Sequence, residues 1–564
     1  MNNKTIISIF HKTIILVLAL IMSVTSYADN VEINGIFYDL NKATKEATVT
    51  RGVLSSSYAS YKGDINIPSS VTYNDTTYIV TSIGENAFFF YKDINSVTIP
   101  NSITSIGDRA FCSCEGLNSI TIPNSTTSIG KDSFVGCKRI TSVIIPSSVT
   151  SIGIGAFASC PNLDSIIVDK GNKTYDSRNE CNAIIETATN KIITGCKTTI
   201  IPESVTSIGD KAFYNCEFLT SIKIPNSVTV IGNYAFVGCN NLIAITLPQS
   251  VRSIGDGVFK VCQSLTTVNI PNSITSIGDM AFCGCEKITS ISIPESVKNI
   301  GKDAFSDCHS ITSIYIPQSI ICIGEDAFIN CTSLTSIKVD KNNTKYDSRN
   351  DCNGIINTST NEFIKGCVNS TIPESVTSIG KNAFSSCKNL RSIIIPQSVK
   401  TIGESAFANC NSLKSVTIHD SVTSIGAKAF WGCGFSSFKI PSNLTYIGSE
   451  AFIYTNLEHI TIPASLTNID PNAFQYCINL KSVTNLSKIP QKITYYTFQK
   501  EDHAHGPVTI MPVKDGDTST EYTQHIEHSK KEAEPIILFV PKNCKKAYQK
   551  AEGWKLFQIE ELEE

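Results

Sequence analysis

The feature that most constrains this chain is a spacing of about 23 residues that recurs along its length, and a fixed period in this range is the signature of a solenoid in which each repeat forms one coil. The prolines at this spacing are Pro202, Pro225, Pro248, Pro271, Pro294 and Pro317, and the phenylalanines are Phe213, Phe236, Phe259, Phe282, Phe305 and Phe328. A single coil cannot bury its own apolar face, so its stability must come from its neighbours.

The repeat Leu219–Asn241 shows how one coil is expected to run. Leu219, Ile222 and Ile224 alternate with polar residues, which predicts a short strand with one buried face. Pro225 then ends the strand because it has no amide proton to donate. Ser227 follows in the turn, where its hydroxyl can bond a nearby backbone group.

The second half of the same repeat is expected to return and close the coil. Val228 and Ile231 point inward, and Gly232 is expected to supply a positive φ for a tight turn. Ala235 and Phe236 are expected in a short helical or 3₁₀ segment, and the cysteine that follows is read as a small apolar filler.

Residues 1–28 have the three parts of a secretory signal peptide. Lys4, His11 and Lys12 precede an apolar run, and Ala28 ends a sequence typical of a cleavage site. The run is shorter than the roughly 20 residues of a membrane span. We therefore expect a secreted or cell-surface protein without a transmembrane segment. The alternative reading of this stretch is a buried N-terminal strand or helix.

The mature chain divides into a cap, an array and a second cap. Residues 29–80 are the expected N-terminal cap, with turns at Asn34-Gly35 and Asn74-Asp75 and a first degenerate repeat. Residues 81–483 are the repeat array, with fifteen recognisable repeat phenylalanines from Phe88 to Phe474. Residues 484–564 are the C-terminal cap, with a strand at 536–540 and an amphipathic helix at 544–557. Caps are needed because an open solenoid end exposes its core.

Two insertions, near residues 168–200 and 339–371, interrupt the array. Matching residues of the two insertions are separated by the same number of positions along the chain throughout. Phe157 and Phe328, which lie outside the insertions, have this same separation, which indicates that a whole block was duplicated. Each insertion is expected to form a β-hairpin. Pairing Ile185 with Lys191 would bring Cys181 close to Cys196, and the same register would bring Cys352 close to Cys367. Because exported proteins are oxidised, we expect two disulfides here.

The pattern Leu-x-x-Ile-x-Ile-Pro-x-Ser-Val-x-x-Ile-Gly-x-x-Ala-Phe-x-x-Cys resembles the BspA-like leucine-rich repeat surface proteins. The resemblance implies a leucine-rich repeat solenoid, which is a right-handed curved superhelix of short parallel strands, turns and short helical or 3₁₀ segments. It also implies adhesion or interaction at a cell surface. The chain departs from the commoner leucine-rich repeat because serine replaces the ladder asparagine in most coils, Asn443 being an exception.

No constellation of catalytic residues is present in the sequence, and we expect neither an enzyme nor a bound cofactor. Of the 21 cysteines, thirteen occupy one repeat position, which is typical of buried structural thiols. Residues 500–534 contain His503, His505, His525 and His528. These histidines could bind a transition metal, but we favour the interpretation that the segment is a polar loop. The net charge of −3 gives no indication of a nucleic-acid partner.

The exposed side chains of the strands, expected on the concave side, are the candidate contact surface. Most of them are Ser or Thr, and the larger ones that vary between coils are Lys223, Tyr315, Lys338, Lys439 and His459. Such a surface favours an extracellular protein partner, from a host matrix or a microbial surface. The alternative is a glycan, which would favour aromatic platforms, and a secreted enzyme is disfavoured.

Overall fold

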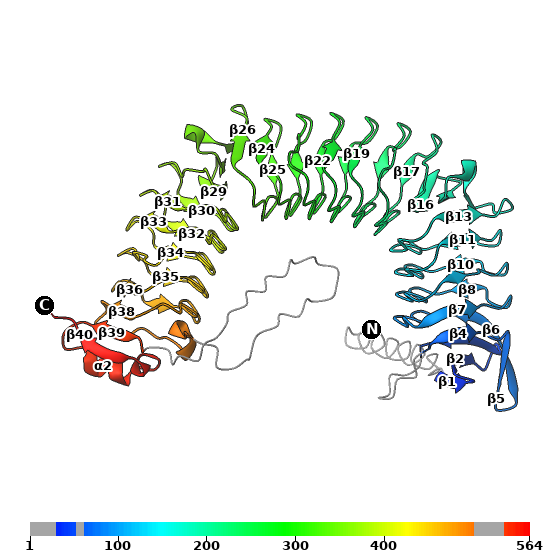
Figure 1. Cartoon of the computed structure of the whole chain (residues 1–564), viewed down its shortest axis with the longest axis horizontal. Coiled ribbons are helices and arrows are strands. Elements are labelled where there is room, and N and C mark those ends of the chain that lie inside the picture. The colour runs from blue at the N-terminus through cyan, green and yellow to red at the C-terminus, as the bar shows by residue number, and fades with distance from the viewer. Residues whose placement is uncertain (1–29, 52–60, 501–534, 564) are drawn as a thin grey trace, which may run out of the picture. The chain divides into compact units, whose positions relative to one another are not determined.

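The computed structural model describes residues 30–51, 61–500 and 535–563 (Figure 1). The chain divides into two compact units, residues 1–227 and residues 228–564. The expected signal peptide and the histidines between 501 and 534 lie outside the described residues.

Both units are solenoids of parallel strands. Most coils contribute to each of two rows of strands, which we call ladders and which hydrogen bonding divides into several sheets. The long-strand ladder contains the strand before the proline, and the short-strand ladder contains the Ser-Ile pair before the glycine. In both ladders a residue pairs with the equivalent residue of the next coil, as Ser313 does with Ser336 and Ser276 does with Asn299. The predicted solenoid of short parallel strands is therefore confirmed.

In the first unit the long-strand ladder consists of β4 (Gly63–Asn66), β7 (Ile94–Thr98), β9 (Ser119–Ile120), β11 (Ser142–Ile145) and β13 (Ser165–Val168). The short-strand ladder consists of β6 (Thr76–Ile83), β8 (Ser105–Ile106), β10 (Ser128–Ile129), β12 (Ser151–Ile152) and β17 (Ser207–Ile208). Residues 219–224, from which the strand was inferred, form no assigned strand, although Leu219 and Ile224 are buried as expected.

In the second unit the long-strand ladder consists of β19 (Ala244–Thr246), β21 (Thr267–Asn269), β24 (Ser313–Ile316), β26 (Ser336–Val339), β31 (Ser392–Ile395), β33 (Ser415–Ile418), β36 (His459–Ile462) and β38 (Ser482–Asn485). The short-strand ladder consists of β18 (Val230–Ile231), β20 (Ser253–Ile254), β22 (Ser276–Ile277), β23 (Asn299–Ile300), β25 (Cys322–Ile323), β30 (Ser378–Ile379), β32 (Thr401–Ile402), β34 (Ser424–Ile425), β35 (Tyr446–Ile447) and β37 (Asn468–Ile469). Within this unit, β31, β33 and β36 lie on the outer side of the curved stack and β30, β32 and β34 on its inner side (Figure 1). The concave placement expected for the long strands is therefore wrong here.

The segment around each Ala-Phe pair is a series of turns, not the expected helical or 3₁₀ segment. The N–H groups of Asp303, Phe305 and Asp307 donate to the carbonyls of Glu325, Ala327 and Ile329 in the next coil, at 3.0, 2.8 and 3.0 Å. Asp303 and Asp307 have positive φ values of 52° and 56°. These alternating conformations point every second N–H along the stack, so the segment forms a third ladder, which we call the turn ladder.

The repeat glycine has a different role from the one expected. Gly278 and Gly301 do not have positive φ. A Cβ atom on Gly301 would instead lie 2.5 Å from the Asp279 nitrogen in the preceding coil. Glycine is required because the two backbones approach each other closely, and the positive φ falls two residues later, at Asp303.

The repeat phenylalanines stack face to face along the core. Ring centroids of Phe88 and Phe111 lie 5.0 Å apart in the first unit, and those of Phe282 and Phe305 lie 5.3 Å apart in the second. Phe498, whose sequence context lacks the repeat pattern, continues the stack on Phe474 at 5.2 Å. It ends the 3₁₀ helix η3 (Tyr495–Phe498). The aromatic column therefore extends one coil beyond the array predicted from the sequence.

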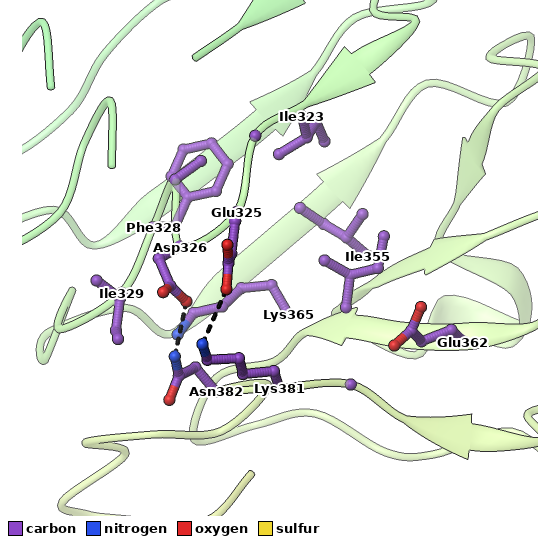
Figure 2. Close-up of a pocket in the computed structure, with 14 residues that line it drawn as sticks. Ile323, Glu325, Asp326, Phe328, Ile329, Ile355, Glu362, Lys365, Lys381 and Asn382 are labelled. Atoms are coloured by element: carbon purple, nitrogen blue, oxygen red, sulfur yellow. Dashed lines mark hydrogen bonds and ion pairs between the residues drawn. The ribbon is translucent and has the colours of Figure 1, made fainter. Parts of the chain in front are cut away.

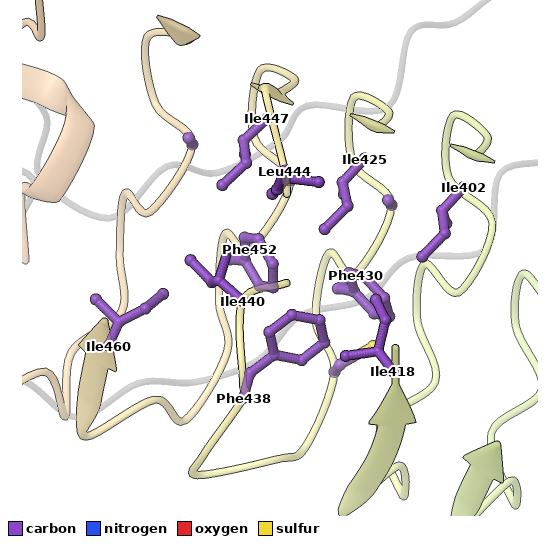
Figure 3. Packing of buried hydrophobic residues seen from close by; sticks show 14 of the residues in the cluster. Ile402, Ile418, Ile425, Phe430, Phe438, Ile440, Leu444, Ile447, Phe452 and Ile460 are labelled. Carbon is purple, nitrogen blue, oxygen red and sulfur yellow. The ribbon is translucent and has the colours of Figure 1, made fainter. Parts of the chain in front are cut away.

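Where the repeat becomes shorter, before Pro441, aromatic side chains refill the core. Phe435 and Phe438 replace the usual aliphatic residues of the strand and are buried. Figure 3 shows Phe438 between Phe430 and Phe452, and its ring centroid lies 5.0 Å from each of theirs. The shortened coil thus remains closely packed.

Each insertion is a hairpin with a third short strand. In the first unit β14 (Tyr175–Asp176) and β16 (Lys191–Gly195) flank β15 (Ala183–Glu186), after the 3₁₀ turn η1 (Arg178–Glu180). In the second unit β27 (Tyr346–Asp347) and β29 (Glu362–Lys365) flank β28 (Ile355–Asn357), after η2 (Arg349–Asp351). The last strand of each hairpin joins the short-strand ladder, since β16 pairs with β17 and β29 pairs with β30 in parallel.

Strands and helices that do not follow the repeat pattern lie at both ends of the array. Strands β1 (Asn30–Ile33), β2 (Ile36–Asn41) and β3 (Glu46–Thr50) precede β6, and β5 (Ser70–Tyr73) pairs with β6 through the expected turn at Asn74-Asp75. At the other end, β39 (Ile537–Val540) and β40 (Gln558–Glu561) extend the long-strand ladder. The expected helix is two shorter ones, α2 (Lys545–Lys550) and η4 (Trp554–Leu556). Tyr548 and Trp554 are buried, whereas Ala547 is exposed.

Candidate interaction surface

The five residues predicted to contact a ligand lie on the exposed side of the long-strand ladders. Tyr315, Lys338 and His459 are in β24, β26 and β36, and all three side chains face solvent. Lys223 and Lys439 occupy corresponding positions in coils that have no assigned strand there. The structure brings only Tyr315 and Lys338 together, since they are paired residues of adjacent strands.

Tyr315 belongs to a polar cluster at the start of the second insertion. Its hydroxyl donates to Asp340 Oδ2 at 2.6 Å, and its side chain is 40% exposed. This hydrogen bond is the main reason why the pKa of Tyr315 is raised to about 12 and the pKa of Asp340 is lowered. With Lys338 beside it, the cluster presents an aromatic ring, a cation and an anion.

The other three candidates have partners in neighbouring coils. Lys223 Nζ lies 3.4 Å from a Glu203 carboxylate oxygen. Lys439 Nζ lies 3.8 Å from Asp420, and His459 Nδ1 lies 2.8 Å from the Ser482 hydroxyl. These contacts are at the surface, where an ion pair adds little stability. The side chains therefore remain available to a partner.

The smaller polar residues on the coil surface serve the solenoid itself. Thr335 donates both its N–H and its hydroxyl to the carbonyl of Thr312, at 2.9 and 3.2 Å. Ser273 and Ser296 likewise donate to Val251 and Ile274 in the preceding coil, at 2.7 and 2.6 Å. The serine that replaces the ladder asparagine thus bonds between coils.

Sequence reasoning missed an apolar part of the exposed row. Ile144 in β11 and Ile167 in β13 are paired neighbours, and their side chains are 59% and 49% exposed. In the second unit Ile394 is 64% exposed. The signal was present, because in these coils an isoleucine occupies the middle position of the strand, where many other coils have threonine or lysine.

An exposed aromatic cluster on the turn ladder of the second unit was also missed. Tyr454 is 52% exposed and stacks on Tyr476 with ring centroids 5.2 Å apart. Trp431 lies edge to face against Tyr454 at 5.7 Å. All three follow a repeat phenylalanine by one or two residues, in consecutive coils.

The expected disulfides are not formed in the structure, and the register assumed for them is wrong. Ile185 pairs with Ile192 because a bulge follows Ile184, and Ala183 then faces Gly195. Cys181, Cys196, Cys352 and Cys367 are all free thiols. The Cys196 thiol lies 3.3 Å from the Asn182 carbonyl oxygen, to which it donates.

A cavity of about 200 Å³ lies in the second unit where the insertion separates two coils (Figure 2). Lys381 Nζ lies 2.9 Å from Glu325, and the Asn382 amide donates to Asp326 at 2.8 Å. The buried Lys365 also lines the cavity. Within the described ranges, no cluster of three potential metal ligands is found, and no helix is long and apolar enough to cross a membrane.

A sequence profile described as the BspA type leucine rich repeat region, in six copies, matches residues 81–193, 183–279, 252–361 and 356–481. The chain belongs to this family. The resemblance inferred from the repeat pattern is thereby confirmed, and proteins of this family are leucine-rich repeat proteins. No match was found among the curated proteins compared with the chain.

The solved structures similar to this BspA-type chain include bacterial leucine-rich repeat proteins. It is 28% identical to a leucine-rich repeat protein from Bacteroides ovatus, covering 81% of this chain and 94% of that one, with a TM-score of 0.40. It is 26% identical to a leucine rich cell surface protein from Faecalibacterium prausnitzii, covering 83% and 92%, with a TM-score of 0.39. It is 16% identical to the pneumococcal vaccine antigen PcpA, covering 95% and 99%, with a TM-score of 0.41.

Proposed function

We propose that the chain is a secreted or cell-surface module that mediates adhesion by binding other proteins, of a host or of another microbe. The supporting observation is the exposed row of the long-strand ladders. Its core-facing side chains repeat from coil to coil, whereas its outward side chains change from threonine to isoleucine, tyrosine and lysine. A row of unlike side chains on a rigid ladder can make many contacts with one partner at once.

Two parts of this row are the main contact candidates. The pair Ile144 and Ile167 offers exposed apolar area in the first unit. Tyr315 and Lys338 offer an aromatic ring beside a cation in the second unit. Tyrosine is common among residues that dominate binding energy, because a rigid ring gives large contact area for little lost entropy.

The test is to screen purified residues 29–564 against arrays of extracellular matrix proteins, bacterial surface proteins and glycans. For any protein bound, Tyr315→Ala, Lys338→Ala, the double variant Ile144→Thr/Ile167→Thr and a deletion of the second hairpin are compared with the parent. Threonine is chosen because Thr121 occupies the equivalent position in the preceding coil. Thr246→Ala, on the same row, is the matched control.

At least one of the four variants is expected to weaken binding by tenfold or more while retaining the parent's circular dichroism spectrum. Unchanged binding by all four would place the contact surface elsewhere and refute this assignment. A chain that binds no protein but binds glycans would favour the second candidate.

That second candidate is a glycan-binding surface module. It is supported by the cluster of Trp431, Tyr454 and Tyr476, since exposed aromatic faces can pack against sugar rings. The distinguishing variant is Tyr454→Ala, which should abolish glycan binding and leave protein binding by the strand row unchanged.

A further inference from the structure

The cavity in the second unit lies at an interruption of the turn ladder. In the coil before it, Asp303, Phe305 and Asp307 donate their N–H groups to the coil that follows. The coil of Phe328 has no successor in register, because residues 339–371 intervene before the coil of Phe384. Among the described residues, the N–H groups of Asp326 and Phe328 have no acceptor.

The aromatic column is interrupted at the same place. Phe305 stacks on Phe328, and Phe363 of β29 stacks on Phe384, but no ring contact joins Phe328 to Phe363 among the described residues. The gap is bridged by side chains instead: Glu325 to Lys381, Asp326 to Asn382, and Asn330 to Ser386. This leaves space, and unsatisfied backbone donors, inside the stack.

Lys365 extends into this space from β29. Its side chain runs from the strand toward Asp326 and Asn382 (Figure 2). The residue is only 7% exposed, and its ammonium has no ion pair or hydrogen bond within the described part of the chain. An ammonium that faces the cavity without a partner in the described part of the chain, close to the free N–H groups of Asp326 and Phe328, can donate to an anion that enters the cavity.

The duplicated block offers a natural comparison. The position that corresponds to Lys365 in the first unit is Thr194, which is also buried. The position that corresponds to Asp326 is Gly155. A buried lysine at this position is therefore specific to the second insertion and is not needed to form such a hairpin.

The carboxylates around the cavity limit which anion can bind. Glu325 is paired with Lys381, and Asp326 accepts from Asn382. Glu362 lies on the opposite side of Lys365 from these two in Figure 2. With three acidic side chains nearby, a dianion such as phosphate would be repelled more strongly than a monoanion. The volume has room for roughly six groups of the size of a water molecule.

We propose that this cavity binds a small monocarboxylate. One carboxylate oxygen accepts from the Lys365 ammonium, and the other accepts from the N–H groups of Asp326 and Phe328. The short alkyl part of the ligand packs against the apolar lining, which includes Ile323 and Ile355. This site is separate from the exposed strand row and does not depend on the proposed adhesion function.

The test measures binding of acetate, propionate and butyrate by calorimetry and by the rise of the melting temperature, at constant ionic strength set with sodium chloride. A ligand that binds only the folded chain raises its stability by mass action. The variants are Lys365→Met, which keeps the side-chain length, and Lys365→Thr, which copies the first insertion. Lys400→Met, which removes an exposed lysine of the second unit that does not line the cavity, is the control.

The expected result is a melting temperature that rises with propionate or butyrate in the parent and in Lys400→Met. Inorganic phosphate should bind more weakly. Both Lys365 variants should lose at least tenfold in affinity. A crystal grown with 3-bromopropionate should show the bromine anomalous signal beside Lys365.

Three results would overturn the proposal. One is a parent chain that responds to the carboxylates no more than to chloride. Another is a Lys365 variant, folded by circular dichroism, that binds them as the parent does. The third is an equal loss of binding in Lys400→Met, since the loss would then not depend on the cavity.

Discussion

The thiol of Cys285 donates to the carbonyl oxygen of Phe259 in the preceding coil, at an S···O distance of 3.1 Å. The same oxygen accepts the N–H of Cys262 within its own coil, at 3.2 Å. A carbonyl oxygen has two lone pairs, so both are used. Cys308 repeats the thiol contact with Phe282 at 3.2 Å. The repeat cysteine is therefore a donor between coils and not only the small apolar filler expected from the sequence.

Cys285→Ala should lower the free energy of unfolding by about 1–2 kcal/mol, because it removes a buried hydrogen bond and leaves a small void. Cys285→Ser retains a donor and should lose less. The measurement is hydrogen exchange of the amides of the two coils, together with the melting temperature, because long arrays need not unfold in one step. Equal exchange rates in the parent and Cys285→Ala would show that the thiol contributes only volume.

The cysteines should differ sharply in reactivity in the native chain. Of the 21 cysteines, only Cys322 is classed as exposed. Burial raises the pKa of the Cys262 and Cys477 thiols to about 12. Since the thiolate is the reactive form, 5,5′-dithiobis(2-nitrobenzoate) at pH 8 should modify Cys322 within the first minutes. Cys112, Cys283 and Cys387 are half-buried and should follow slowly.

The remaining thiols should react only after denaturation, and Cys322→Ser should abolish the fast phase. Non-reducing peptide mapping in the same experiment tests the insertion cysteines. A disulfide between Cys181 and Cys196, or between Cys352 and Cys367, would show that the hairpin register of the oxidised protein differs from the one described above.

A whole coil should be removable from the second unit. Deletion of Leu265–Lys287, which is one complete repeat, should leave a folded chain in which Phe259 stacks on Phe305, because contacts in a solenoid join nearest neighbours. The control is an out-of-register deletion of Leu265–Thr275, which should misalign every later coil. If the whole-coil deletion unfolds the chain as the control does, nearest-neighbour stacking is not what stabilises it.

The hydrogen bond between Tyr315 and Asp340 should be detectable in a titration of the Asp340 carboxyl group. The tyrosine hydrogen bond is the largest cause of the lowered pKa of Asp340, and the N–H of Asn342 is the next. Tyr315→Phe should therefore raise the pKa of Asp340 toward, but not up to, its ordinary value. The measurement is an NMR titration of ¹³C-labelled aspartate, and an unchanged pKa would contradict the contact.

The sign of the accompanying pH dependence follows from the direction of the shift. Because the folded-state pKa of Asp340 is below the unfolded value, the interaction stabilises the chain above the unfolded pKa and is lost as the pH falls through the folded one. Both side chains are solvent-exposed, so we expect the change in global stability to be small.

Local patterns were sufficient to predict the coils and the hairpins. The spacing of Pro225 and Phe236 with their equivalents is a property of the chain alone, and it determined the solenoid because each coil can only bury its apolar side against another. The exposed isoleucines Ile144 and Ile167 were also readable from the strand pattern, although they were overlooked. The turn at Asn74-Asp75 was predicted because its residue types tolerate positive φ.

What only the tertiary structure decided are the contacts made between coils and the consequences of their interruption. The targets of the Cys285 thiol and the Ser273 hydroxyl lie 26 and 22 residues away, and no local pattern specifies which backbone group they will reach. The role of Gly301 and the bulge after Ile184 likewise depend on how closely a neighbouring backbone approaches. Lys365 looks like an ordinary strand lysine in the sequence. Its ammonium faces a cavity, without a partner among the described residues, because the insertion separates two coils that would otherwise satisfy each other's hydrogen bonds.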